Sequence, residues 1–205
     1  MAQETNSIEC VIIRTYPSKD ADLVIRVIAR GHGKLSLYAR NTRGGGKKGR
    51  QKIPEVFNLA TFEITAGKGD LYGIRAIPYL KSLEGISSDL AKLTAASVLV
   101  EAYDFLSLEH VPMESDLYDP LALSLQAISE SLSLKDTLKS LHIGLGAVLA
   151  ISGYDHTART LPPSLNNLRT LIDTVEQRAE KQLVSAPSLL EFFEQVEKEH
   201  ASERN

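Results

Sequence analysis

Apolar and polar residues alternate along the first 80 positions of the chain, and this alternation predicts β-strands. The runs are rich in β-branched residues, and short turns that contain glycine or proline separate most of them. The expected strands cover residues 8–16, 23–30, 34–40, 55–65 and 70–80. Strands this short would expose edges open to pairing with other chains, so we expect them to close into a small antiparallel barrel.

Beyond residue 86 the apolar positions recur with helical spacing. The expected helices cover residues 90–106, 117–132, 134–151, 165–175 and 189–196. The first is apolar on nearly all sides, which predicts a buried helix. The pattern therefore predicts an α+β protein of two domains, a five-stranded barrel over residues 1–82 and an all-α helical domain over residues 83–205.

Local signals mark the ends of these helices. Ser133 with Asp136, and Ser188 with Glu191, have the spacing of a capping box, in which side chains satisfy the free amides of a first turn. Gly153 follows an apolar run and predicts the end of a helix.

Charge divides at the same place as the periodicity, although the whole chain has a formal net charge of only −3. Residues 1–82 contain 14 Lys and Arg against seven Asp and Glu, whereas residues 83–205 contain nine against 19. Such asymmetry is typical of a nucleic-acid-binding half joined to another module. Two oppositely charged surfaces that attract each other are the alternative.

The positive charge is concentrated in residues 40–52, which include six basic residues, four glycines and no acid. We expect this segment to be a flexible loop between two strands that neutralises phosphates. Its candidate ligands of phosphate are Arg40, Arg43, Lys47, Lys48, Arg50 and Lys52.

The expected strand before this loop places Lys34 and Tyr38 on one face and Leu35 and Leu37 on the other. Arg26 lies in the neighbouring strand. Cations that follow a backbone and an aromatic ring that stacks on a base suit single-stranded nucleic acid. The alternative is that the aromatic residues are half-buried in packing and the arginines extend along the surface.

Several motifs fail to support an enzyme. Gly44, Gly46 and Gly49 have the spacing of a dinucleotide fingerprint, but a strand is expected after them where that motif needs a helix. A phosphate-binding P-loop would need Lys and Ser or Thr after Gly49, where the chain has Arg50 and Gln51. No catalytic constellation stands out, and we expect no enzymatic activity and no cofactor.

Cys10 is the only cysteine, which excludes an internal disulfide and a cysteine-based zinc site. It falls within an apolar strand and is expected to be an inert core thiol. The five histidines have no metal-ligand spacing, so no metal is expected. The N-terminus has no apolar signal-peptide region, and the apolar run 141–151 is too short to span a bilayer. We expect a cytoplasmic protein.

Several stretches, in this order, resemble RecO-type recombination mediator proteins. They are Val11-Ile12-Ile13-Arg14-Thr15-Tyr16 with Asp20-Ala21-Asp22-Leu23-Val24, Gly31-His32-Gly33-Lys34-Leu35-Ser36 with Ala39-Arg40, Gly69-Asp70-Leu71-Tyr72-Gly73-Ile74-Arg75, and residues 93–106. The resemblance covers about residues 8–150. It implies an OB-fold N-terminal domain followed by a helical domain.

The resemblance also implies binding and annealing of single-stranded DNA, with double-stranded DNA as a further ligand, at the nucleoid. Its implied partners are RecR and the acidic tail of single-stranded-DNA-binding protein, so that RecA is loaded at gaps. Many members carry a four-cysteine zinc module in the helical domain, which this chain cannot form. For the acidic tail, Lys135 and Lys139 are the candidates, one helical turn apart, unless they are ordinary solvated lysines.

The function predicted from the sequence is therefore a non-enzymatic recombination mediator in DNA repair. Two alternatives stay open: an OB-fold protein that binds RNA, and an interaction adaptor whose positive half binds an acidic protein.

Overall fold

A computed structural model describes residues 6–18, 22–40, 54–67, 71–109, 117–154 and 160–202. The chain forms two compact units. We call Met1–Leu83 with Ser107–Ala122 the barrel unit, and Glu84–Leu106 with Leu123–Asn205 the helical unit.

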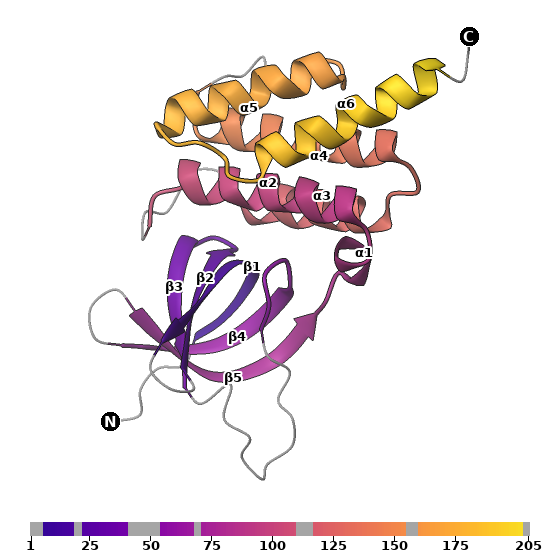
Figure 1. The fold of residues 1–205 in the computed structure, drawn as a ribbon. Helices are drawn as coiled ribbons and strands as arrows, with labels where there is room; N and C mark the ends of the chain where they lie inside the picture. Colours follow the sequence, from indigo (N-terminus) through magenta and orange to yellow (C-terminus); the bar gives the residue numbers. More distant parts are fainter. Residues whose placement is uncertain are drawn as a thin grey trace, which may run out of the picture. The chain divides into compact units, whose positions relative to one another are not determined.

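Five strands form a closed barrel in the barrel unit, as Figure 1 shows. They are β1 (Asn6–Ser18), β2 (Asp22–Ala29), β3 (Gly33–Ala39), β4 (Leu59–Ala66) and β5 (Leu71–Lys81). Their order around the barrel is β1-β2-β3-β5-β4. All neighbours are antiparallel except β3 and β5, which pair in parallel over three residues. This arrangement confirms the predicted OB-fold barrel.

The barrel interior is filled by the alternate residues that the sequence pattern assigned to it. In β3 these are Leu35, Leu37 and Ala39, and in β1 they include Cys10 and Ile12. The register of β1 against β2 shifts between Ile12 and Arg14. A bulge of this kind increases the local twist and bends the strand, which helps the 13-residue β1 to follow a tightly curved sheet.

One predicted strand is too long at its start. β4 begins at Leu59, whereas the sequence pattern placed the strand from residue 55. Phe57 has a φ of 72°, which no strand residue adopts. The side-chain Oδ1 of Asn58 accepts a hydrogen bond of 3.1 Å from the backbone amide of Glu55, so this segment is a turn.

Helices follow the barrel, which confirms the predicted α+β class. They are α1 (Glu84–Ser87), α2 (Leu90–Leu106), α3 (Tyr118–Glu130), α4 (Leu134–Ile151), α5 (Leu165–Ala179) and α6 (Ala186–Ser202). Within the helical unit, α2 contacts α4, α5 and α6. This central position explains why α2 is apolar on nearly all sides, and it agrees with the predicted burial.

The helix expected over residues 90–106 is confirmed as α2, and a short helix, α1, precedes it. The last residue of α1 is Ser87, and Asp89 lies just before Leu90, the first residue of α2. The Asp89 carboxylate accepts a 3.0 Å hydrogen bond from the backbone amide of Lys92, and the Asp89 carbonyl accepts one of 2.9 Å from the amide of Leu93. A residue that caps a first turn in this way has a non-helical backbone itself, so α1 and α2 are separate helices.

The cap predicted for α4 is confirmed. The Ser133 hydroxyl accepts from the backbone amide of Asp136 at 3.2 Å and donates to its carboxylate at 2.6 Å. The helix ends as predicted, with Gly153 at a φ of 75°.

The cap predicted at Ser188 is wrong. α6 begins at Ala186, and the Ser185 carbonyl accepts the amide of Leu189. The Ser185 hydroxyl and amide bind the Glu101 carboxylate of α2 at 2.8 and 3.3 Å. A tertiary contact therefore fixes this helix start three residues earlier than the local pattern indicated.

Candidate functional site

The outer face of β2 and β3 brings together two of the predicted cationic residues. Arg26 and Ser36 are register partners on these neighbouring strands. Both alternate with core residues, so they are on the outside of the barrel. Lys34 shares this face with them, two residues before Ser36 along β3.

An acid from a distant part of the chain covers this face. Glu109, in the barrel unit, forms an isolated parallel bridge with Lys34. Its Oε1 accepts a hydrogen bond from the Ser36 hydroxyl, and its Oε2 lies 3.7 Å from Nη2 of Arg26. Lys34 is only 7% exposed and Ser36 only 9%, although neither faces the barrel core.

Two tyrosines border this face in different ways. The Tyr38 hydroxyl donates to the Asp22 carboxylate, and the side chain is half-buried. This hydrogen bond is the main cause that raises the pKa of Tyr38 above its ordinary value. Tyr16 is exposed, and Cζ of Arg26 lies 5.7 Å from the centroid of its ring. Arg26 thus lies between an aromatic ring and a carboxylate.

Of the remaining predicted phosphate ligands, the structure describes Arg40. Arg40 follows β3 and is exposed. Arg43, Lys47, Lys48, Arg50 and Lys52 lie outside the described residues. Sequence reasoning did not select Tyr79 of β5, which is 50% exposed and is therefore open to a ligand on the barrel surface.

A second cluster on the barrel unit ties the end of β2 to the start of α3. Nε of Arg30 lies 2.8 Å from the Glu9 carboxylate, and Nη1 lies 2.8 Å from that of Asp119. Cζ of Arg30 lies 4.3 Å from the centroid of the Tyr118 ring. Burial is the main cause that raises the pKa of Tyr118. Arg30 is therefore occupied by protein groups and has a structural role.

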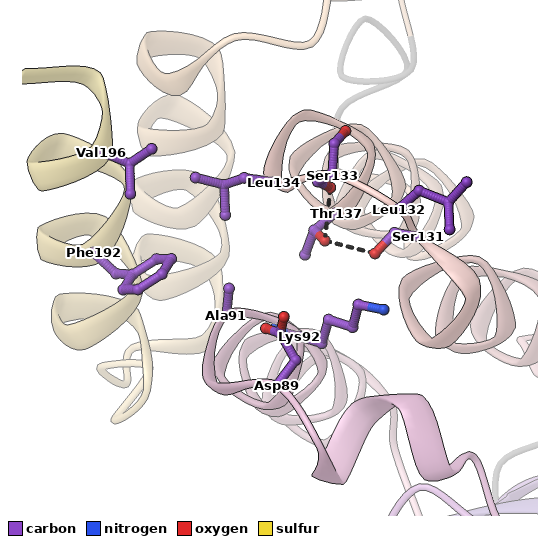
Figure 2. Close-up of a pocket in the computed structure, with 10 residues that line it drawn as sticks. All are labelled: Asp89, Ala91, Lys92, Ser131, Leu132, Ser133, Leu134, Thr137, Phe192 and Val196. Atoms are coloured by element: carbon purple, nitrogen blue, oxygen red, sulfur yellow. Dashed lines mark hydrogen bonds between the residues drawn. The ribbon is translucent and has the colours of Figure 1, made fainter. Parts of the chain in front are cut away.

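The helical unit contains a groove of about 400 Å³ between α2, α4 and α6, which we call the helical groove (Figure 2). Its lining residues are Asp89, Ala91, Lys92, Ser131, Leu132, Ser133, Leu134, Thr137, Phe192 and Val196. Figure 2 shows Phe192 and Val196 on one wall and Lys92 with Ser131 and Thr137 on the other. Leu132 is 98% exposed at its rim. The groove thus combines apolar surface with one ammonium group.

Polar groups inside the helical groove are largely satisfied by the protein. Nζ of Lys92 donates to the carbonyl of Ser129 at 3.0 Å. The hydroxyls of Ser131 and Thr137 lie 2.7 Å apart, and Thr137 donates to the carbonyl of Ser133. The predicted partner-binding residues Lys135 and Lys139 are both exposed on α4, although neither lines the groove.

The residues present do not fit the zinc module that many RecO-type proteins carry. Cys10 is fully buried in the barrel core, and burial raises the pKa of its thiol far above the usual range. This agrees with the predicted inert thiol. Within the described ranges, no group of three or more His, Cys, Asp or Glu is placed to hold a metal ion. None of the described helices is long and apolar enough to cross a membrane.

The fold and its surface define the class of protein: an OB-fold barrel, with cationic residues on its outer face, joined to an all-helical unit. Residues 1–83 match the family described as recombination protein O N terminal. This match confirms the resemblance indicated by the strand motifs.

Similarity to curated proteins extends beyond the barrel. The chain is 27% identical over 143 residues to DNA repair protein RecO of Bifidobacterium animalis subsp. lactis, covering 62% of this chain and 59% of that protein. It is 24% identical over 135 residues to the protein of the same name from Anaeromyxobacter dehalogenans strain 2CP-C, covering 65% and 52%. Over 98 residues it is 30% identical to that of Streptomyces griseus, covering 44% and 39%. The matches span about half the length of these relatives.

Proposed function

We propose that this protein is a non-enzymatic recombination mediator in DNA repair. In this proposal the barrel binds and anneals single-stranded DNA, and the helical unit binds protein partners. The observation that carries it is the OB-fold barrel within residues 1–83, which match the recombination protein O domain, with Arg40 exposed at the end of β3. The names of the similar proteins, all DNA repair protein RecO, support the same process.

The proposed path of the single-stranded DNA follows the cationic residues of the barrel unit. Arg40 lies exposed where β3 ends, and in the sequence it is followed by the basic segment 41–52, which lies outside the described residues. Tyr38 and Arg26 lie behind Arg40 on β3 and β2, which extends the path along the barrel. Lys34 shares this face but is only 7% exposed, so a phosphate could reach it only if Glu109 moved away. Charges at these positions would neutralise successive phosphates, and exposed aromatic rings would stack on bases without reading sequence.

A salt-dependent titration with a single-stranded oligonucleotide tests the DNA-binding step. The affinity should fall with salt, with a log–log slope of about −0.7 for each neutralised phosphate. Changing Lys47, Lys48 and Arg50 together to Ala should weaken binding and flatten that slope. The matched control changes Lys181, Lys198 and Arg178 of the helical unit to Ala, which removes the same charges. Equal losses in both variants, or a flat salt response, would contradict the proposal.

Two further outcomes separate the alternatives. Stronger competition by RNA than by DNA of equal length would favour an OB-fold protein for RNA. Capture of the same acidic protein from a lysate before and after nuclease treatment would favour an interaction adaptor, because a nucleic-acid bridge would be lost.

For the partners, we propose that the helical groove and Lys135 with Lys139 receive the acidic tail of single-stranded-DNA-binding protein. The argument is chemical complementarity. Leu132 and Phe192 offer apolar contacts, and the two exposed lysines of α4 follow Leu134 along the same helix. Acidic side chains would pair with the lysines while apolar side chains enter the groove. RecR is the second proposed partner, so that RecA is loaded at gaps in coated DNA.

Fluorescence polarisation with a labelled peptide that ends in this acidic tail tests the groove. Leu132→Ala and the pair Lys135→Glu and Lys139→Glu should each weaken binding. Leu123, another exposed leucine, supplies the matched control Leu123→Ala, which should bind normally. If the control loses as much affinity as Leu132→Ala, the groove is not the site.

A further inference from the structure

The contact between Glu109 and the barrel has the features of an occupied anion site. A hydroxyl from Ser36 and a guanidinium from Arg26 both reach the carboxylate, one to each oxygen. These two donors come from register partners on neighbouring strands, so the sheet fixes their separation. The Tyr16 ring borders the guanidinium on another side. Rigid strands therefore position every donor of this site.

The same donors suit a phosphodiester. A phosphate in a nucleic-acid strand carries one negative charge and offers unesterified oxygens, as the carboxylate of Glu109 does. Arginine and hydroxyl donors are common ligands of both groups. The site also lies on the proposed strand path, because Ser36 precedes Tyr38 and Arg40 on the same strand.

The pair formed by Glu109 and Arg26 is open to exchange. Its N–O distance is 3.7 Å, longer than a charge-assisted hydrogen bond of about 2.7–2.9 Å. The two side chains are 27% and 35% exposed, so the pair is partly solvated. Such partly solvated pairs stabilise a fold only weakly. Displacement of the carboxylate breaks this weak pair and the hydrogen bond from Ser36, and a phosphate at the site can replace both contacts.

We propose that Glu109 is an internal competitor for one phosphate of the bound strand, at the site formed by Arg26 and Ser36. This inference rests on the proposed DNA binding. A carboxylate and a phosphate cannot share the site, since their charges repel. Binding at Arg26 therefore requires the Glu109 carboxylate to leave, and the apparent affinity is reduced by the fraction of molecules in which it stays.

Glu109→Gln tests the competitor, because it keeps the size of the side chain and an acceptor for Ser36 but removes the charge. Oligonucleotide affinity should rise about twofold to fivefold, as expected for losing a weak surface pair. The log–log salt slope should steepen by up to about 0.7, because Arg26 then neutralises a phosphate without releasing an acid.

Glu63→Gln is the matched control, since Glu63 is a half-buried acid on β4 of the same barrel. It removes the same charge and should leave the slope unchanged. Equal changes of affinity and salt slope in Glu63→Gln and Glu109→Gln would overturn the inference, because the loss of one negative charge from the barrel would then explain both.

Arg26→Gln completes the test, and its effect is measured both in the unaltered chain and in the Glu109→Gln variant. In the unaltered chain Arg26 is already engaged by Glu109. The loss of oligonucleotide affinity caused by Arg26→Gln should therefore be smaller in the unaltered chain than in the Glu109→Gln variant. Equal costs in both backgrounds would overturn the competition. Loss of binding when Lys47, Lys48 and Arg50 are changed, with no effect of Glu109→Gln, would refute the competitor and leave the proposed function standing. The absence of salt-dependent binding by any variant would refute both.

Discussion

Cζ of Arg30 lies 4.3 Å from the centroid of the Tyr118 ring, and the same guanidinium binds the carboxylates of Glu9 and Asp119. One side chain at the end of β2 thus connects β1, β2 and the first turn of α3 within the barrel unit. Arg30 and Asp119 are 89 residues apart in the chain, so this contact closes a long loop.

Arg30→Gln should lower the denaturant midpoint of unfolding, because it removes the cation from two carboxylates and from the ring. About 1 M salt should reduce the difference from the unaltered chain, since both ion pairs are partly exposed. Chemical unfolding at low and high salt measures this. A difference that persists unchanged in high salt would assign the effect to packing of the side chain.

Gly144 allows α4 to approach its neighbours closely. A Cβ at this position would lie 2.7 Å from Cδ1 of Leu99 and 2.9 Å from Oγ of Ser124. Gly144→Ala should therefore destabilise the protein by about 1–3 kcal/mol, in spite of the better helix propensity of alanine.

Leu99→Val provides the control for Gly144→Ala, because it removes the atom that the new Cβ would meet. The double variant should lose less stability than the two single losses added together. Strict additivity, measured by urea unfolding, would show that the close approach is not the cause.

Ser133 caps α4 through the backbone amide of Asp136. Ser133→Ala should cost about 1 kcal/mol of unfolding free energy, because that amide loses its acceptor. Ser140→Ala removes a hydroxyl from the same helix, one that donates only to the Asp136 carbonyl. This control should change stability by less than about 0.5 kcal/mol. Comparable losses would contradict the capping role.

His142 is only 2% exposed, and its Nε2 has no hydrogen-bond partner among the described residues. Burial lowers the pKa of His142 below its ordinary value of 6.5. The folded chain therefore binds this proton less readily than the unfolded chain. The resulting stability is present above pH 6.5 and is lost as the pH falls through the pKa of the folded state.

Urea unfolding at about pH 7.5 and pH 5 should show this loss of stability. His142→Gln, which cannot take up the proton, should have a smaller difference between the two pH values. His32→Gln, at an exposed position, should keep the full difference. An unchanged difference in His142→Gln would assign the acid sensitivity to other groups.

Local patterns predicted the elements well where one residue and its near neighbours determine the structure. Alternation placed Leu35, Leu37 and Ala39 in the barrel core, and spacing found the cap at Ser133. The predicted helix start was wrong where a residue distant in the sequence determines it. Ser188 seemed to be a cap from its spacing, but Glu101 of α2 fixes the helix start through Ser185.

The candidate site shows the same limit. Alternation correctly directed Lys34 and Ser36 away from the core, and exposure was the natural expectation. Glu109, 73 residues from Ser36, covers both, and no periodicity in the sequence relates these positions. Tyr38 is likewise held by Asp22, whose carboxylate accepts its hydroxyl. Sequence could assign charge to the face, but not the acid that occupies it.

The burial of Cys10 has a practical consequence for chemical labelling. The chain has one cysteine and no tryptophan, and the high pKa of the Cys10 thiol leaves almost no thiolate to react with a maleimide. A cysteine introduced between β3 and β4 would therefore carry a dye alone, with no need to remove the native thiol. A tryptophan introduced there would likewise be the only one in the emission spectrum, so either probe would report on that segment alone.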